Sequence, residues 1–267
     1  MERYRLKNII ILILVLVNVS LLSSLLYRKS EESGMLRRTE EELVALFAAS
    51  DITLERSAIS WDEPPAGVSM TRSADREREF ARALLGGELR ETSQGGINVY
   101  RSNAGIVEFR SSGSFDALLL QSPENTEDFC ENLCRTFSFT APAFTLDETG
   151  TGTATAVYEF EKLPVYNASM TFTVTEGSLT GLSGTLLPAE GVPNSEEDLL
   201  SCAAALTAFQ QMRREEGTVG SSILRIYFCY ELQSTPSSPM ALGSTWCIVT
   251  DIASYYVNCS SGAITVG

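Results

Sequence analysis

Apolar and polar residues recur along the chain with the spacings of short helices and short strands. A helical spacing of apolar residues predicts amphipathic helices over residues 39–49, 74–85, 122–137 and 194–216. Runs rich in β-branched and aromatic residues predict strands near residues 52–59, 88–93, 97–101, 105–111, 153–161, 165–175, 178–187, 222–232, 244–251, 254–259 and 262–266. Helices and strands are mixed along the chain, which favours an α+β fold.

One short pattern occurs three times. Around Gly105, Gly177 and Gly262 an apolar-rich strand meets a few small or polar residues, then glycine, then a second apolar-rich strand. Glycine tolerates the positive φ of a tight hairpin, so each copy predicts a β-hairpin. A predicted helix precedes each hairpin. We therefore expect tandem modules of antiparallel sheet with helices packed on one face.

The longest apolar run lies near the N-terminus. Residues 9–26 carry no charge, and with Asn8 and Tyr27 they are just long enough to cross a bilayer as a helix. A cleaved signal peptide is the alternative, but the run is longer than usual and no A-x-A site follows. The expected organisation is a cytoplasmic segment (1–7), a transmembrane signal anchor (8–27) and two extracytoplasmic modules (28–120 and 121–267).

The orientation follows from what flanks the run. The first seven residues form a short basic segment, which usually stays in the cytoplasm. A long domain behind a first apolar helix is usually carried across the membrane. We therefore expect a single-pass protein of the cell membrane with its C-terminal domain outside. Small polar residues in the run, Ser20, Ser23 and Ser24, share one stripe and could contact a second membrane helix, although serine is tolerated in many spans.

The charge excludes one class of partner. The net charge is −14, and the first seven residues contribute +2, so the remainder carries about −16. Nucleic-acid binding needs basic patches, and none is visible in the sequence.

The cysteines favour structural roles. Six are present; Cys130 and Cys134 have helical spacing beside apolar residues, which favours buried positions over a zinc site. Cys247 and Cys259 could lie opposite each other if a hairpin turns near Ala253, which would allow a disulfide outside the cell.

Candidate chemistry is sparse. The chain contains no histidine, so a Ser-His-Asp or Cys-His site and a histidine-ligated zinc are excluded. Two carboxylates among Glu159, Glu161 and Asp251 could hydrolyse a glycoside, but Glu159 and Glu161 alternate with apolar residues as on a solvated strand face, and Asp251 suits a turn. We predict that the protein is not an enzyme and binds neither a metal nor a cofactor.

Aromatic residues near the C-terminus are the remaining candidates for contact with a partner. Trp246, Tyr255 and Tyr256 could form a stacking surface, although aromatic residues in strands more often serve as core or cross-strand partners.

Two segments carry a resemblance to a known family. EKLPVYNASMTFTVTEGSLTGL (161–182) and WCIVTDIASYYVNCSSGAITV (246–266) resemble the YycI/YycH family of Gram-positive bacteria. The matching residues include Pro164, Trp246, Asp251, Asn258 and Gly262. The hairpins are also similar to PepSY domains. Residues 30–120 diverge from the pattern, and the cysteines are not part of it.

The resemblance implies a regulatory function. It implies a membrane-anchored protein that binds and modulates a two-component sensor histidine kinase controlling cell-wall metabolism, together with a YycH-like single-span protein. The alternative is a PepSY-like extracellular protease inhibitor or peptide-binding protein. A third class, a cell-envelope hydrolase or carbohydrate binder, would need a deep acidic or aromatic-lined cleft.

Overall fold

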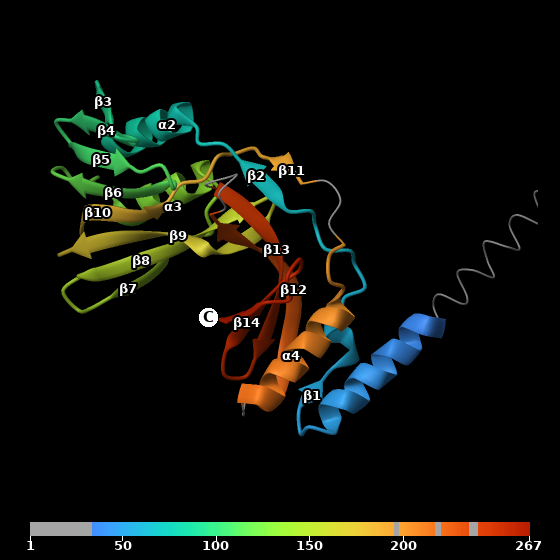
Figure 1. The fold of residues 1–267 in the computed structure, drawn as a ribbon. Coiled ribbons are helices and arrows are strands. Elements are labelled where there is room, and N and C mark those ends of the chain that lie inside the picture. Colours follow the sequence, from blue (N-terminus) through green and yellow to red (C-terminus); the bar gives the residue numbers. More distant parts are fainter. Residues whose placement is uncertain (1–33, 195–197, 217–219, 235–239) are drawn as a thin grey trace, which may run out of the picture.

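The computed structural model describes residues 34–194, 198–216, 220–234 and 240–267, and within them fifteen strands form a single sheet (Figure 1). One half of the sheet is an antiparallel array in the spatial order β3 (Arg90–Gln94), β4 (Ile97–Ser102), β5 (Gly105–Phe109), β6 (Ser114–Leu119), β10 (Ser178–Thr185), β9 (Leu163–Thr175), β8 (Gly152–Phe160) and β7 (Ala143–Leu146).

The other half is built around the C-terminal hairpins. Its strands are β12 (Ser222–Gln233), β13 (Met240–Thr250), β14 (Ser254–Asn258), β15 (Ile264–Val266), β2 (Val68–Met70), β11 (Val192–Pro193) and β1 (Thr53–Leu54). A 3-10 turn, η1 (Arg56–Ala58), follows β1.

The two halves join where β9 begins beside β12. Val165 pairs with Tyr230 in parallel, and the Asn167 side chain continues the ladder. Its Nδ2 donates to the Leu232 carbonyl at 2.9 Å, and its Oδ1 accepts from the Leu232 N–H at 2.7 Å. A side-chain amide thus replaces backbone groups at the junction.

The predicted fold class is wrong on two points. The strands form one mixed sheet, with parallel pairs at β1–β12 and β9–β12, instead of tandem antiparallel modules. The hydrophobic pattern predicted the hairpins but carried no information on how β9 meets β12. Within the described ranges, no helix is long and apolar enough to cross a membrane. The predicted anchor, residues 8–27, lies outside the described residues.

Every described helix packs on the same face of the sheet. The helices are α2 (Ala74–Leu85), α3 (Thr126–Thr136), α4 (Cys202–Glu216) and a helix over residues 34–48. Val165 and Tyr230 are cross-strand partners, so the buried faces of both halves are continuous through them. Figure 1 shows α2 and α3 over one end of the sheet, and α4 beside the blue helix at the other.

Two cores fill the space between helices and sheet. In the first, Phe80 of α2 packs against Phe109, Phe115 and Phe137 with ring centroids 4.9–5.9 Å apart. In the second, the Phe47 ring stacks on Phe209 of α4 above the C-terminal hairpins. Each core combines residues from both sides of residue 120.

The helix boundaries follow local capping. For α2, the Ser73 hydroxyl accepts from the Arg76 N–H, and Gly86 ends the helix with φ 60°, as the sequence predicts. The predicted start of α3 at Ser122 is wrong, because Asn125 is the N-cap. Ser122 instead accepts from the Leu179 N–H at 2.8 Å.

The helix predicted from residue 194 begins later than expected. Of the described residues ahead of it, 198–201 are not helical, and α4 starts at Cys202. This segment is bound to the sheet: the Trp246 indole donates to the Leu200 carbonyl at 2.9 Å, and the Leu200 N–H donates to the Cys259 carbonyl. Residues 195–197 of the predicted helix lie outside the described residues.

Two of the three repeated glycines lie at hairpin turns. Gly177 follows Glu176 in a two-residue turn with φ 75° and 51°, and Gly262 has φ 71° between β14 and β15. Gly105 differs: it begins β5, and a Cβ added there would lie 2.3 Å from the Leu118 carbonyl oxygen. This glycine is required by the close approach of β6.

We predict that Gly105→Ala lowers the free energy of unfolding by about 2–3 kcal/mol, because β5 and β6 must separate to admit a methyl group. Gly87→Ala is the matched control. Gly87 also has positive φ, but nothing lies within 4 Å of the position that a Cβ would occupy, so the expected loss is about 1 kcal/mol. Urea denaturation measures both, and equal losses would contradict the packing argument.

Candidate interaction surface

In the first half of the sheet, the side chains on the face opposite the helices are exposed or half-exposed, so no described element is packed on it. The register places two rows of side chains across it in the first half of the sheet. One row is Arg90, Arg101, Ile106, Leu118, Gly181, Thr173, Thr153 and Thr145. The other is Thr92, Val99, Glu108, Asp116, Ser183, Thr171, Thr155 and Ala143. We call this surface the open face.

The open face is polar over β7–β10 and mixed over β3–β6. The hydroxyl-rich half suits a solvated antiparallel sheet. The β3–β6 half instead carries an apolar patch, which consists of Ile97, Val99, Ile106, Leu118 and Leu120. Leu118 is 56% exposed although it lies on a strand with neighbours on both sides, and Leu120 is 71% exposed. Exposed apolar patches with a charged rim are typical of interaction sites.

A tyrosine pair extends this face across the junction. The Tyr166 and Tyr256 rings are stacked with centroids 3.7 Å apart and planes at 8°. Tyr166 donates to Glu231 Oε1 at 2.8 Å, and the other carboxylate oxygen accepts from Gln233 and Asn258. Glu231 thus accepts three hydrogen bonds, and it holds Tyr166 in place at the junction.

Two buried thiols lie beneath these rings. Cys229 and Cys247 share the face, since Cys229 pairs with Thr245 and Cys247 with Tyr227. A hydrogen bond from Cys229, followed by one from Tyr227, lowers the pKa of Cys247 to about 7. The pKa of Cys229 rises, because its proton is held by Cys247 and because the group is buried.

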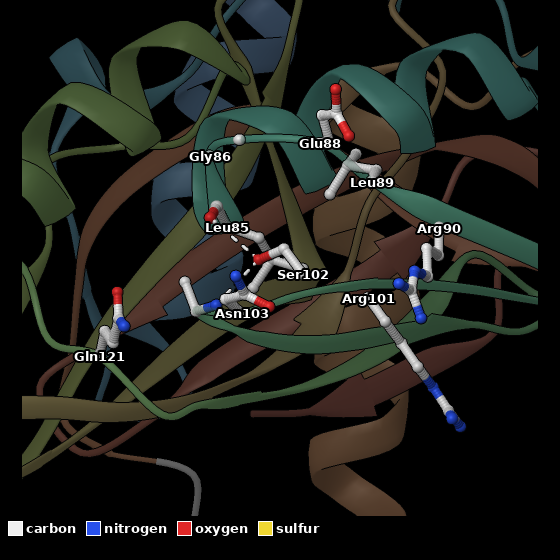
Figure 2. A pocket seen from close by; sticks show the side chains of 11 residues that line it. Leu85, Gly86, Glu88, Leu89, Arg90, Arg101, Ser102, Asn103 and Gln121 are labelled. Carbon is white, nitrogen blue, oxygen red and sulfur yellow. Dashed lines mark hydrogen bonds between the residues drawn. The ribbon is translucent and has the colours of Figure 1, made fainter.

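A hollow of about 690 Å³ lies at the corner where α2 meets β3 and β4. Figure 2 shows Gly86 and Leu89 on the loop after α2, with Ser102 and Asn103 at the β4–β5 turn, and Gln121 at the far side. Ser102 donates to the Leu85 carbonyl at 3.2 Å and so holds the helix end against the turn.

Arginine side chains form one side of this hollow. Arg90 and Arg101 are directly opposed in the β3–β4 ladder, and both are exposed (Figure 2). Like charges placed directly opposite each other destabilise a strand pair. An anion bound between them would remove that cost.

The candidate carboxylates are separated. Glu159 and Glu161 line a second hollow of about 550 Å³ with Glu131, Arg135 and Lys162. Glu161 lies in the β8–β9 turn with φ 50°. Asp251 is at the other end of the molecule, where it accepts from the Ser221 hydroxyl at 2.7 Å; the hydrogen bonds from Ser221 and then Ser222 lower its pKa. Asp251 therefore fixes a loop, in line with the turn role that its position favours.

The three aromatic candidates do not share a surface. Trp246 is fully buried beneath α4, and Tyr255 packs against Phe209 with centroids 5.0 Å apart. Tyr256 points to the opposite face and is half-buried against Tyr166. Trp246 and Tyr255 are core residues, which is the commoner role of aromatic residues in strands.

The structure does not bring Cys247 and Cys259 together. The hairpin turns at residues 251–253 as expected, but the register places Tyr256 opposite Cys247. Cys259 lies beyond the end of β14, where its N–H donates to the Ser244 carbonyl. All six cysteines are free and buried.

Two further predictions concern metals and the serine stripe. In the part of the chain that the structure describes, no group of three or more histidine, cysteine, aspartate or glutamate residues could hold a metal ion. Ser20, Ser23 and Ser24 lie outside the described residues.

The sequence did not predict Arg90, Arg101 or Leu118 as site residues. The available signal was in SFDALL (114–119), where Leu118 falls on the same side of the strand as Asp116 and so breaks the alternation. The opposition of the two arginines depends on register and has no local signal.

Comparison with known proteins gives only distant likenesses. No protein-family model matches the chain, and no curated protein matches it. A solved structure of an uncharacterized protein from Eubacterium rectale is similar with a TM-score of 0.41 and 12% identity, over 81% of this chain and 83% of that one. The C-terminal domain of Bacillus megaterium YpeB has a TM-score of 0.38 and 13% identity, over 74% of this chain and 98% of that one.

These TM-scores are too low to carry an argument about fold or function. Of these two likenesses, the one to YpeB relates to the PepSY-like resemblance, and it is weak. No finding matches the YycI/YycH resemblance.

We predict that the Cys247 thiol makes stability depend on pH. A folded-state pKa of about 7, below the ordinary value of 9.0, stabilises the fold at high pH, and this contribution is lost as the pH falls through 7. The contribution of Cys247 to the free energy of unfolding should rise by about 1–2 kcal/mol between pH 7 and pH 9. The pKa values of the other five thiols are raised, so these thiols lower stability over the same range, and the Cys247 contribution is measured as the difference between the wild type and a Cys247→Ala variant.

Urea denaturation under reducing conditions at several pH values measures this effect. Relative to the wild type, Cys247→Ala should become less stable as the pH rises from 7 to 9, and Cys259→Ala, which removes a thiol outside the pair, should not. An equal relative change in both variants would show that Cys247 is not the cause.

Proposed function

We propose that this protein is a binding module that acts by contacting another protein through the β3–β6 half of its open face. The observation that carries the proposal is the exposure of Leu118, at 56% on an internal strand, within an apolar patch. Burying such a patch against a partner is favourable by roughly 25 cal/mol for each Å² of apolar area removed from water.

The charged rim supports a specific contact. Arg90 and Arg101 lie at one end of the row that contains Ile106 and Leu118, and Glu108 and Asp116 lie in the next row. Charges at the rim of an apolar patch fix the orientation of a partner more than they add affinity. The patch and its rim therefore favour a protein partner over a small apolar ligand.

The identity of the partner comes from the sequence resemblance. The YycI/YycH-like segments suggest a two-component sensor histidine kinase that controls cell-wall metabolism, with a YycH-like protein in the same complex, outside the cytoplasm. Binding can change the activity of a kinase only if it favours one of the kinase's states. The proposed mechanism is therefore a state-selective contact without chemistry.

A peptide-binding function is the second candidate. It is favoured by β3, an edge strand whose five residues are all exposed. Addition of a peptide strand to a free sheet edge is a common mode of recognition.

The first test uses the full-length chain as bait in its native cells, with mass spectrometry of the proteins that co-isolate. We expect Leu118→Asp to reduce recovery of the principal partner at least tenfold. Leu224→Asp is the matched control, because Leu224 is equally exposed at 56% but lies on β12 in the other half of the sheet.

Two outcomes would count against the proposal. Equal recovery with both variants would show that the β3–β6 patch is not the contact. Recovery of a partner other than a sensor kinase, lost on Leu118→Asp, would keep the contact and overturn the kinase assignment. Extracellular accessibility of a C-terminal tag to added protease tests the location.

A further inference from the structure

We propose that β3 receives an extended acidic segment of a partner protein as an added strand, with Arg90 and Arg101 binding its carboxylates. The inference deepens the proposed function, because it names the chemistry of what a binding module of this shape would recognise. The site proposed here lies at the edge of the sheet, whereas the apolar patch around Leu118 lies on its open face.

The first observation is a free edge. The path through the sheet ends at β3, which pairs only with β4 among the described strands. Each of its residues, Arg90–Gln94, is exposed, so no described helix or loop covers it. An uncovered edge presents backbone N–H and C=O groups to an incoming strand.

The second observation is a pair of uncompensated charges. Among the described residues, the side chains of Arg90 and Arg101 make neither an ion pair nor a hydrogen bond. Two other arginines in this half of the molecule do have carboxylate partners: Arg78 pairs with Asp75 and Glu91, and Arg110 pairs with Asp116. In a chain with a net charge of −14, the directly opposed pair Arg90 and Arg101 forms a local concentration of positive charge without a carboxylate partner.

The third observation is the hollow beside the arginines. Figure 2 shows Arg90 and Arg101 on one side of it and Asn103 and Gln121 on the other. Its volume of about 690 Å³ is large enough for several side chains of a bound segment. The arginines on one side and the amide groups on the other offer hydrogen-bond donors that suit carboxylates. Glu88 also lines the hollow and would repel a carboxylate placed beside it, so the arginine side is the one that would bind the carboxylates.

The geometry favours an acidic peptide over other anions. Binding of a nucleic acid or of an anionic membrane needs an extended basic surface, and the overall charge of this chain opposes both. Two arginines at one position along a strand match one or two carboxylates. The free backbone edge beside them adds the hydrogen bonds that select an extended chain.

The experiment measures fluorescence anisotropy of labelled peptides with the full-length chain. The probes are seven-residue peptides that alternate valine with glutamate or valine with lysine. We expect the glutamate peptide to bind and the lysine peptide not to bind. Raising the salt concentration should weaken binding, because the arginines are exposed. The glutamate peptide with N-methyl groups on alternate residues, which cannot pair as a strand, should also fail to bind.

The protein variants locate the site. Arg90→Glu with Arg101→Glu should weaken binding at least tenfold, and the two corresponding lysine substitutions should retain most of it. The matched control is Arg135→Glu with Lys162→Glu, which makes the same change in charge at the second hollow and should have no effect. Far-ultraviolet circular dichroism confirms that each variant is folded.

The outcomes separate this inference from the proposed function. Equal weakening by both glutamate variants, or undiminished binding of the N-methylated peptide, would overturn the edge site. Loss of partner recovery with Leu118→Asp would still support the open face in that case. Conversely, peptide binding that depends on Arg90 and Arg101 would stand even if the Leu118 variant recovers its partner normally.

Discussion

The fold depends on the pairing of β9 with β12. Val165 meets Tyr230 there, and the Asn167 amide hydrogen-bonds to the N–H and the C=O of Leu232 at the point where the strands diverge. Val165 and Tyr230 are both buried in the first core, so this pair joins the packed side of one half to that of the other. Because the shared pair is buried on one side, all described helices lie on that side.

This arrangement divides the molecule into a covered face and an open face. The covered face holds the aromatic residues of the two cores, including Trp246 and Tyr255, whereas Tyr166 and Tyr256 lie on the opposite face. All six thiols are buried within the molecule. The open face is left to hydroxyl groups, one apolar patch and a few charges. The residues suited to contact a partner are therefore on a surface made by strands distant in sequence, with Arg90 and Leu118 in the same row.

The sequence predicted those parts of the structure that are decided locally. The apolar spacing over residues 74–85 predicted both ends of α2, which Ser73 and Gly86 cap, and the small residues before Gly177 and Gly262 predicted two hairpins. The start of α3 was placed too early, because Ser122 and Pro123 resemble a helix start while Asn125 forms the cap. Only the register could show which strands meet, and it is set by packing between distant segments.

In the candidate site too, some features follow from the local sequence and others only from the strand register. Tyr255 and Tyr256 are adjacent on a strand and must point to opposite faces, so no surface could contain both. That exclusion was available from the sequence alone. The opposition of Arg90 and Arg101 was not, because it exists only once β3 and β4 are aligned.

The burial of all six thiols has a consequence for how the chain is made. Once the core has closed, oxidants have little access to these sulfurs, whereas in the nascent polypeptide every thiol is accessible. In an oxidising compartment, burial of the thiols by folding therefore competes kinetically with the formation of non-native disulfides. A quality-control protease would mainly degrade those chains that form disulfides before they fold.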